Sequence, residues 1–263
     1  MAALAACLLT ACSGGARPTT PPSSIRSSSS AHPPPTAGVP RGGIELDLCG
    51  ACVQAAARAG VGLRDVVRAT IARARSLIPL PATRVSIRAD PEATIPELGV
   101  GGFTDVVNGR VHISIDPEFH DLPAAMRTWL PLTLAHELDH AERVLHGPGY
   151  GRTLLGTMVS EGLADAFAGQ VFPDAPAIPW DHALTPEQER AVWAYAEPRL
   201  GHRQNSGRHS LWFYGTGRIP RWAGYTIGYD IVTSYLRSHP NATVASITDL
   251  PAHRILRDSG FQP

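Results

Sequence analysis

The sequence predicts an α+β domain that is mostly helical and has a small antiparallel sheet. Three observations lead to this fold class: several long segments carry apolar residues at helical spacing, residues 84–90 alternate apolar and polar side chains, and Asn108-Gly109 is a strong turn signal between two apolar runs. The 263 residues are 43% hydrophobic, enough for a folded core, and 23 basic residues balance 23 acidic ones. This balance gives no global field that favours nucleic acid, so we expect no nucleic-acid partner.

The amino terminus is predicted to direct the protein out of the cytoplasm. Residues 1–12 are small and apolar and end in Leu-Thr-Ala-Cys, which resembles a bacterial lipoprotein signal with Cys12 as the lipidated residue. Residues 13–42 are rich in Pro and Ser, so we expect a disordered tether. Together these segments predict an exported protein, anchored through Cys12 to the outer face of the bacterial cytoplasmic membrane, or secreted. The alternative is a chance Leu-Thr-Ala-Cys in an alanine-rich terminus, since no positive charge precedes the apolar run.

The folded domain is expected over residues 43–263, and Cys49 and Cys52 lie near its start in the sequence CGAC. A C-x-x-C pair can be a redox motif, half of a zinc site or a local disulfide. The chain has no second C-x-x-C, which excludes a four-cysteine zinc site, and no thioredoxin-like βαβ context is visible around the pair. In an exported protein a structural disulfide is the simplest interpretation, and we predict one between these two cysteines.

The first half of the domain is predicted to contain two helices, a strand and a hairpin. Apolar residues at helical spacing over 44–78 are interrupted around Gly60 to Gly62, which indicates two helices. The segment RVSIRAD, residues 84–90, predicts a half-buried strand. Residues 99–117 predict a hairpin, in which Val106 and Val107 lead into the Asn108-Gly109 turn.

The second half is predicted to be helical. A long helix should begin after Asp121 as N-cap and end near residue 145, because HGPGYG cannot continue it. Three further segments show helical patterns, at 153–170, 186–200 and 224–238. A Gly- and Arg-rich loop is expected at 201–218, and a short segment at 250–261 closes the chain.

The long helix carries the pattern H-E-x-x-H at residues 136–140. Residues four apart lie on the same face of a helix, so His136 and His140 can bind one tetrahedral zinc ion side by side. Glu137 lies about 100° around the helix from His136. It is therefore beside the metal, where it can activate a zinc-bound water and later protonate a leaving amine. The alternative is a surface helix with two unrelated histidines, but the apolar residues that precede the pattern indicate a buried face.

Two residues compete for the third ligand position. His146 has the spacing of the metzincin pattern H-E-x-x-H-x-x-G-x-x-H, but Arg143 stands where that pattern needs its helix-ending glycine. Glu161 follows His140 by 161 − 140 = 21 residues on the next predicted helix, as in gluzincins. Asp165 lies four residues further on the same face, where it can accept the free N–H of a ligand histidine. We therefore predict His136, His140 and Glu161 as the ligands of one zinc ion per chain.

Four stretches, in this order, resemble one bacterial family. They are LTLAHELDHAERV, LLGTMVSEGLADAFA, RWAGYTIGYDIVTSYL and LPAHRILRDSGF, and they lie between residues 84 and 261. The family is that of predicted zinc-dependent proteases catalogued as domain-of-unknown-function family 2268. The resemblance implies a zincin-like catalytic domain of gluzincin type, with His136, His140 and Glu161 as zinc ligands and Glu137 as catalytic base. It does not include the CGAC segment, and it supplies no substrate.

A second group is expected to stabilise negative charge on the scissile carbonyl. In the segment RWAGYTIGYD, Gly224 and Gly228 are four apart, as are Tyr225 and Tyr229, so this helix could approach another one closely and bring a phenol to the site. We name Tyr225 first and Tyr229 second, with His209 and Arg221 as further candidates. The alternative is that both tyrosines are ordinary packing residues.

The strand RVHISID, residues 110–116, directly precedes the active-site helix. We expect it to form the sheet edge above the cleft, where an extended peptide could pair with it.

The sequence thus predicts a lipid-anchored zinc metallopeptidase whose substrate is a peptide or protein. One rival is a metzincin-like protease with His146 as third ligand. Another is a non-catalytic surface lipoprotein that binds metal or a partner on a peptidase scaffold.

Overall fold

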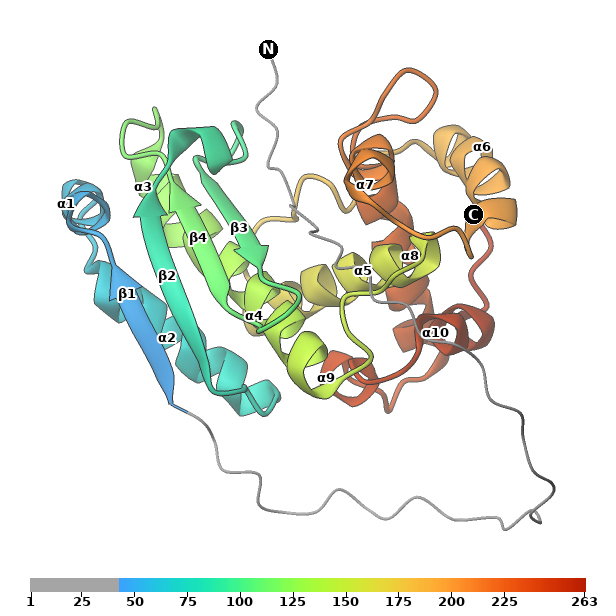
Figure 1. Cartoon of the computed structure of the whole chain (residues 1–263), viewed down its shortest axis with the longest axis horizontal. Coiled ribbons are helices and arrows are strands. Elements are labelled where there is room, and N and C mark those ends of the chain that lie inside the picture. The colour runs from blue at the N-terminus through green and yellow to red at the C-terminus, as the bar shows by residue number, and fades with distance from the viewer. Residues whose placement is uncertain (1–42) are drawn as a thin grey trace, which may run out of the picture.

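The computed structural model describes residues 43–263, in which a four-stranded sheet and a group of helices share one hydrophobic core. Figure 1 shows the sheet at one end of the molecule and the C-terminal helices at the other, with α4 between them. The predicted signal segment 1–12, the lipidated Cys12 and the tether 13–42 lie outside the described residues and stay predictions. Within the described part of the chain, no helix has the length and apolar character needed to cross a bilayer.

The elements up to the hairpin build the sheet half. In chain order they are β1 (Ile44–Leu48), α1 (Gly50–Arg58), α2 (Leu63–Leu77), β2 (Thr83–Ala89), the 3₁₀ turn Pro91–Ala93, β3 (Val100–Thr104) and β4 (Val111–Ile115). The helices that follow build the other half. They are α3 (Leu122–Ala124), the π-helical turn Ala125–Trp129, α4 (Leu130–His146), α5 (Leu154–Val171), α6 (Pro186–Ala196), the 3₁₀ turn Glu197–Arg199, α7 (Ser206–Phe213), α8 (Ala223–Ser238), α9 (Val244–Ile247) and α10 (Ala252–Ser259). The predicted α+β class is confirmed.

The sheet is mixed rather than antiparallel, which corrects the predicted sheet type. Its strand order is β1-β2-β4-β3; β1 and β2 pair in parallel, as do β2 and β4, and only β3 and β4 pair antiparallel. The strand RVHISID therefore lies inside the sheet as β4, and the predicted edge position belongs to β3. Parallel pairing needs long connections, and α1 with α2 supplies the connection from β1 to β2.

The first predicted helix is wrong at its start, because residues 44–48 form β1. The segment IELDL alternates apolar and polar residues and joins the edge of β2. On the outer face of this pair, Glu45 forms an ion pair with Arg84 at 2.9 Å, and Asp47 one with Arg88 at 2.5 Å. Cross-strand pairs of opposite charge favour this register.

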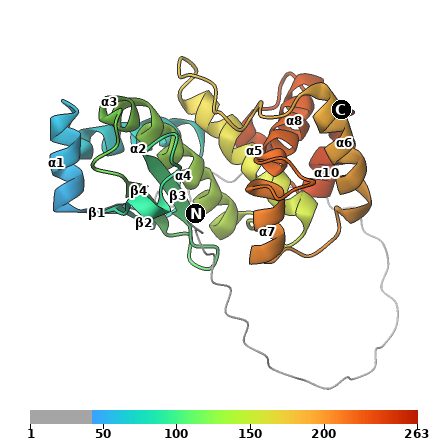
Figure 2. The same ribbon diagram turned by 90° about the horizontal axis from the view of Figure 1, so that it is seen from above.

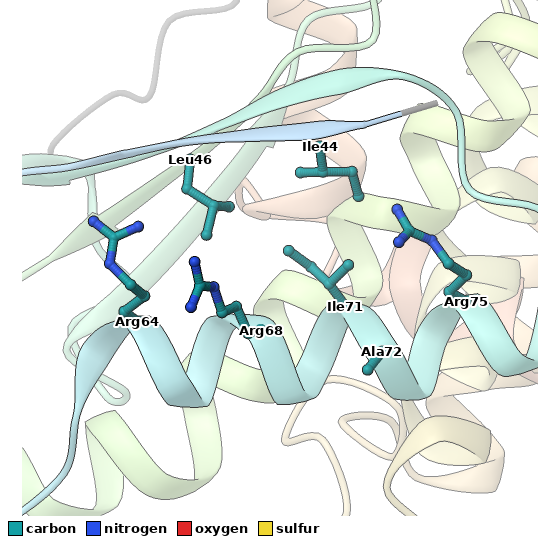
Figure 3. Close-up of a pocket in the computed structure, with 7 residues that line it drawn as sticks. All are labelled: Ile44, Leu46, Arg64, Arg68, Ile71, Ala72 and Arg75. Atoms are coloured by element: carbon teal, nitrogen blue, oxygen red, sulfur yellow. The ribbon is translucent and has the colours of Figure 1, made fainter. Parts of the chain in front are cut away.

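A groove of about 340 Å³ separates β1 from α2 on the other face of this edge (Figure 3). Ile44 and Leu46 point down into it from the strand, and Arg64, Arg68 and Arg75 point up from the helix. The aliphatic stems of the arginines can cover the apolar strand while their guanidinium groups stay at the surface. Charged side chains at an edge also discourage pairing with another chain.

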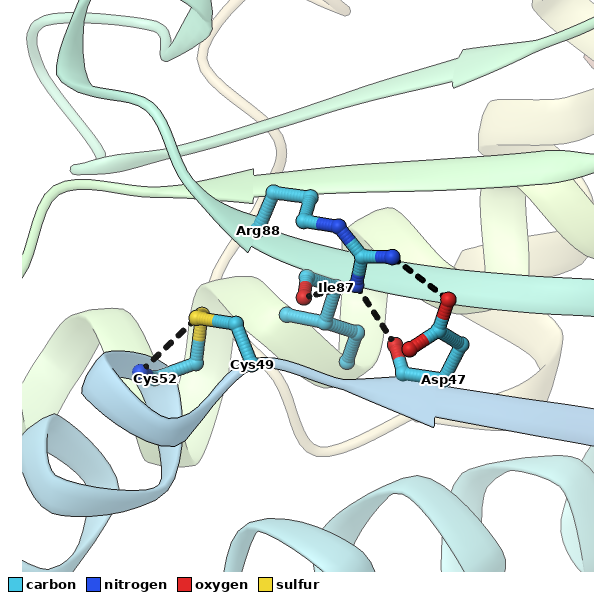
Figure 4. Close-up of a disulfide and its surroundings, with 5 residues drawn as sticks. All are labelled: Asp47, Cys49, Cys52, Ile87 and Arg88. Carbon is cyan, nitrogen blue, oxygen red and sulfur yellow. Dashed lines mark hydrogen bonds and ion pairs between the residues drawn. A yellow bond between two sulfur atoms is a disulfide. The ribbon is translucent and has the colours of Figure 1, made fainter.

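Cys49 and Cys52 are joined in a disulfide where β1 passes into α1 (Figure 4). Cys49 is the N-cap of α1, and its sulfur accepts a hydrogen bond from the Cys52 N–H at 3.0 Å. Closing a loop of four residues restricts the unfolded chain by only about 2 kcal/mol. The bond therefore adds little as a cross-link between distant parts of the fold.

The predicted hairpin is confirmed, but its loop is longer than a two-residue turn. β3 ends at Thr104 and β4 begins at Val111, so Val106 and Val107 lie in the loop, and Val107 is 85% exposed. The Asp105 carboxylate accepts hydrogen bonds from the Val107 N–H and the Asn108 side chain, which stabilises this wider turn. Gly109 adopts the left-handed conformation, φ +64, that closes it.

α4 is buried over almost all of its length and lies on the same face of the sheet as α2 (Figure 2). As predicted, the Asp121 side chain caps the preceding turn by accepting from the Ala124 N–H. The π-helical turn before α4 coincides with Pro131, which has no N–H and whose ring would crowd the carbonyl four residues earlier in a regular α-helix. α4 then continues without a break to His146.

α5 and α8 cross with their backbones in contact. A Cβ atom on Gly162 would lie 2.2 Å from the Gly228 carbonyl oxygen, and one on Gly228 would lie 1.9 Å from the Met158 carbonyl oxygen. The expected small face of α8 therefore meets α5 at Gly228. Gly224 instead lies against the Phe213 ring of α7.

The predicted loop at 201–218 contains a helix, α7, whose N-cap Asn205 accepts from the Arg208 N–H. The glycines and arginines of this segment show no apolar period and so predict a loop, yet Trp212 and Phe213 are buried. The short α9 was not predicted either. It begins with a capping box formed by Thr243 and Ser246.

A buried polar group lies at the C-terminal end of α4, and we call it the arginine cluster: Asp139, Arg143 and Thr248. Arg143 is 2% exposed and donates to the carbonyl oxygens of Thr248 and Leu250. The Thr248 hydroxyl donates to Asp139 at 3.2 Å. These bonds attach the segment after α9 to α4.

Candidate metal centre

His136, His140 and Glu161 come together in the core, and we call them the metal cluster. The two histidines lie one turn apart on α4, and Glu161 faces them from α5. All three residues are buried, and one ligand atom from each lies within 4.8 Å of the other two. The residues predicted as zinc ligands are thus adjacent in space.

The distances within the metal cluster fit a tetrahedral metal. Glu161 Oε2 lies 3.2 Å from His136 Nε2 and 3.4 Å from His140 Nε2. Two ligand atoms of a tetrahedral zinc ion, each about 2.0–2.1 Å from the metal, are about 3.3 Å apart. Two imidazole nitrogens and a carboxylate oxygen also form a donor set that zinc accepts.

The opposite nitrogen of each histidine has its own partner. His136 Nδ1 lies 2.8 Å from Asp165 Oδ1, and the other Asp165 oxygen accepts from Trp180 Nε1 at 3.0 Å. A carboxylate can only accept, so Nδ1 carries the proton and Nε2 keeps its lone pair for a metal. His140 Nδ1 lies 3.4 Å from the Ser160 hydroxyl. Asp165 therefore occupies the position that the sequence predicts for it, and Trp180 and Ser160 are contacts that the sequence analysis missed.

The charges around the metal cluster favour a cation. Burial alone would lower the pKa of His136, but the carboxylates of Asp165 and Glu161 outweigh burial and raise it well above its ordinary value. Burial would likewise raise the pKa of Glu161, but His140 and His136 lower it well below its usual range. Without a metal, the two carboxylates thus favour a second proton on His136, on the Nε2 atom that faces Glu161. A divalent cation could replace that proton.

Glu137 points from α4 toward β3, beside the metal cluster. Its Oε2 accepts a hydrogen bond from the Thr104 hydroxyl at 2.6 Å. A Cβ atom on Gly102 would lie 2.5 Å from Glu137 Oε1, so glycine is the residue that leaves room for this carboxylate under the strand. Burial raises the pKa of Glu137, against the lowering effect of His136 and His140, and a raised pKa suits a general base.

Tyr150 closes the cluster from the loop between α4 and α5, and the sequence analysis did not single it out. Its hydroxyl donates to Glu161 Oε1, and its ring lies 5.2 Å from the His140 ring. Gly149 and Gly151, on either side, have φ values of +83 and +103. The signal that could have identified Tyr150 is a tyrosine held between glycines in the short connection between the two ligand helices.

The two predicted tyrosines of α8 occupy different surroundings. The Tyr225 ring packs between Trp180 at 5.5 Å and Phe213 at 4.9 Å, and burial followed by the Glu161 carboxylate raises the pKa of its phenol well above the ordinary value. Tyr229 lies 5.6 Å from the His182 ring. It lines a neighbouring pocket of about 550 Å³ that also contains Asp165 and Asp181. Tyr225 is thus the phenol of α8 whose electrostatic neighbour is Glu161.

The further candidates, His209 and Arg221, also lie in different surroundings. The His209 ring stacks on Phe213 at 4.4 Å and lies 6.3 Å from the Tyr150 ring, so it belongs to the wall around the metal cluster. Burial lowers the pKa of His209, which keeps it neutral. Arg221 forms an ion pair with Glu97 at 2.5 Å at the surface.

His146, the rival third ligand, lies at the end of α4. Its side chain is 44% exposed, and its Nδ1 lies 3.0 Å from a Glu142 carboxylate oxygen. The helix does not turn at Arg143, which is held by the carbonyls of Thr248 and Leu250. His146 is therefore outside the metal cluster.

Comparison with known proteins adds a family to this geometry. A family model described as "Predicted Zn-dependent protease (DUF2268)" matches residues 63–257. The uncharacterized protein YjaZ of Bacillus subtilis (strain 168) is 28% identical over 150 residues, which is 55% of this chain and 53% of the relative. The uncharacterized protein YjfC of the same organism is 26% identical over 184 residues, 66% of this chain and 59% of the relative. The chain thus spans between half and three-fifths of these relatives, and no solved structure matches it.

Proposed function

The chain belongs to the family of predicted Zn-dependent proteases, and from this premise we propose that it is a zinc peptidase that hydrolyses peptide bonds. One zinc ion per chain would be held by His136, His140 and Glu161. The observation that carries the proposal is the convergence of these three buried donor atoms, at separations of 3.2 and 3.4 Å, with the free nitrogen of His136 fixed by Asp165. A zinc ion satisfies such a convergent donor set.

Glu137 is the proposed general base. A bound zinc ion supplies Lewis-acid chemistry, since it makes water more acidic and polarises a carbonyl. Glu137 takes the proton of the attacking water and passes it to the leaving amine. The hydrogen bond from Thr104 holds one carboxylate oxygen toward β3, and the room under Gly102 keeps the carboxylate beside the cluster.

The proposed substrate is an extended polypeptide that pairs with β3. This strand is the sheet edge next to Glu137, so it replaces the inner strand β4 in the role that the sequence analysis expected. Ile95 covers the edge at Val100 by an antiparallel bridge. Among the described residues, no backbone hydrogen bond outside the β3–β4 ladder uses Gly102 or Phe103. Residues of an antiparallel ladder alternately bond to the partner strand and point away from it, and Val100 points away, so Gly102 does as well. The outward backbone groups of Gly102 would hold the scissile bond over the metal cluster.

Tyr150 and Tyr225 are the groups proposed to support negative charge on the scissile carbonyl. The Tyr150 hydroxyl is at hydrogen-bond distance from Glu161, so a small movement of its loop would bring it to a substrate oxygen. Tyr225 is the second candidate, on account of its electrostatic contact with Glu161. Tyr229 is no longer proposed for this role, because it faces the neighbouring pocket.

The proposed location is outside the cytoplasm, with anchoring to the membrane through Cys12. This part rests on the sequence of residues 1–42 alone. Labelling with a radioactive fatty acid, compared between the unmodified chain and C12S, tests the anchor; equal label in both would overturn it.

The test of catalysis combines zinc analysis with cleavage of casein. Glu137→Gln keeps the three ligands and removes the base, so we expect one zinc per chain and a loss of about 10²–10⁴-fold in kcat. Glu161→Ala should lose both zinc and activity, because two histidines alone do not complete the site.

Glu142→Gln is the matched control. It changes a buried glutamate of the same helix that contacts His146 rather than the metal cluster, and both zinc and activity should persist. Full activity of Glu137→Gln would contradict the assigned base. Stoichiometric zinc without cleavage of any unfolded protein would instead favour a metal-binding protein on a peptidase scaffold.

A further inference from the structure

The disulfide between Cys49 and Cys52 lies in a strand–helix–strand unit that the sequence analysis did not find. β1 ends at Leu48, α1 begins at Gly50, and the chain returns through α2 to β2, which pairs in parallel with β1. Cys49 is thus at the junction between a strand and the N-terminus of a nine-residue helix. The structure thus places the pair in a parallel βαβ unit that the sequence did not reveal.

The two cysteines differ sharply in exposure. Cys52 is 0% exposed in the core under α1, whereas Cys49 is only partly buried. Gly50 and Ala51, between them, are exposed, and a Cβ atom on Gly50 would meet nothing within 4 Å. Cys49 is therefore the cysteine of the pair that keeps some surface toward an approaching polypeptide, whereas Cys52 keeps none.

The surroundings of Cys49 suit a thiolate. Its sulfur already accepts a hydrogen bond from the Cys52 N–H at 3.0 Å, one of the free N–H groups at the start of α1. These groups and the helix dipole would stabilise a negative charge on the sulfur once the disulfide opens.

The backbone at this junction is held firmly. The Cys49 N–H donates to the Ile87 carbonyl at 3.1 Å, and the Arg88 guanidinium donates to the carbonyls of Asp47 and Ile87 (Figure 4). These contacts join the two strands up to Cys49, so the disulfide is not needed to join them. Opening the bond would leave β1 in place.

We propose that Cys49 and Cys52 form a redox-active pair that exchanges disulfides with a partner polypeptide, with Cys49 as the attacking sulfur and Cys52 as the resolving one. In the reduced pair, the Cys49 thiolate attacks one sulfur of a partner disulfide, whose S–S bond breaks and releases a partner thiolate. Cys52, after losing its proton, then attacks the Cys49 sulfur, which closes the Cys49–Cys52 bond and releases the second partner thiolate.

Two electrons pass from the pair to the partner, and the two partner thiolates take up the two protons that the cysteines lose. The reverse sequence oxidises a partner dithiol. This activity is independent of the proposed peptidase, because α1 packs against α2, β2 and α3, at the far end of the molecule from α5 (Figure 1).

The test uses the full chain with Cys7 and Cys12 changed to serine in every variant, so that only the pair can react. The variants C52S and C52A leave Cys49 as the single thiol, and C49S and C49A leave Cys52. Each variant is mixed with oxidised glutathione, and the reaction is stopped with an alkylating agent. The mass of the intact chain is then measured by mass spectrometry. We expect the mixed disulfide to form about tenfold or more faster in the native C52S and C52A variants than in C49S and C49A. In urea the two rates should become equal.

Similar native rates for the two sets, or faster reaction of Cys52, would overturn the assignment. A second measurement follows the unmodified pair in glutathione buffers of graded composition, with circular dichroism on the same samples. We expect the pair to open and close reversibly while the protein stays folded. Reduction that occurs only together with unfolding would show a purely structural disulfide and would also overturn the proposal.

Discussion

α4 carries two buried polar clusters, one turn apart, and they serve the fold in different ways. In the arginine cluster, the guanidinium of Arg143 donates to backbone carbonyls of the segment after α9, so its partners belong to the chain itself. In the metal cluster, the fixed partners contact only the Nδ1 side of each histidine, and the Nε2 atoms face a carboxylate. Buried polar groups that bond to other groups of the chain hold the fold together. Buried acceptor atoms that converge on one point instead indicate a bound ligand.

The largest expected effect is a loss of bound zinc, which should follow from a change in the metal cluster. His140→Ala removes one of the three ligands, so we expect complete loss of bound zinc and of peptidase activity, measured by elemental analysis and casein cleavage. His146→Ala is the matched control, because this histidine lies on the same helix but outside the cluster. Loss of zinc in His146→Ala would contradict the ligand assignment.

The next effect should appear in stability alone. Arg143→Met removes the guanidinium that donates to the two carbonyls and that compensates the charge of the buried Asp139. We therefore expect a loss of about 3–5 kcal/mol in the free energy of unfolding, measured by urea titration. Zinc should remain stoichiometric in the fraction that is folded. Arg190→Met, an exposed arginine of α6, should change stability by less than about 0.5 kcal/mol. A folded but zinc-free Arg143→Met protein would show that the clusters are not separate.

A smaller effect tests the group behind the metal cluster. Asp165→Asn keeps the shape of the side chain but removes the charge that orients His136, so zinc affinity should fall about 10–100-fold. Competition with a fluorescent chelator measures this change, with the exposed Asp174→Asn as control. An unchanged Kd for zinc would mean that Asp165 holds Trp180 in place but does not support His136 as a ligand.

The smallest effect, counted per pH unit, is a change in the pH dependence of stability, and it concerns a proton next to that group. Burial and the neighbouring Asp165 carboxylate raise the pKa of Asp181 to about 10. Between the unfolded value near 4 and this value, the folded state binds one proton more than the unfolded state, so stability falls as pH rises, by at most about 1.4 kcal/mol per pH unit. Asp181→Asn should flatten this slope in urea titrations from pH 5 to pH 9. An identical slope in both proteins would show that Asp181 is ionised in the fold.

The metal cluster was predictable because it depends on short-range regularities. Helical spacing alone brings His136 and His140 together, and the apolar surroundings of Glu161 mark its helix as buried. The presence of Arg143 in place of a glycine also argued correctly against His146 as a ligand, since the helix continues through Arg143. The strand before Cys49 was harder to predict, because β1 is only five residues long and merges with a helical pattern.

The misplaced features depend on long-range contacts. The sequence cannot say that β4 pairs on both sides, because that follows from where β1 and β2 lie. α7 depends on the burial of Trp212 and Phe213, and the contact of Tyr150 with Glu161 joins a loop to a different element. Pattern reasoning works within one element and fails where partners come from different parts of the chain.

The crossing of α5 and α8 at Gly162 and Gly228 has a consequence for how this fold can vary. Gly162 directly follows Glu161, so the distance between the two helix axes also sets how far the carboxylate stands from the histidines of α4. A methyl group at either glycine would act as a spacer and displace the ligand without touching it. The tolerance of the centre is therefore set by two glycines, and relatives that bind metal should be as constrained at these two positions as at the ligands themselves.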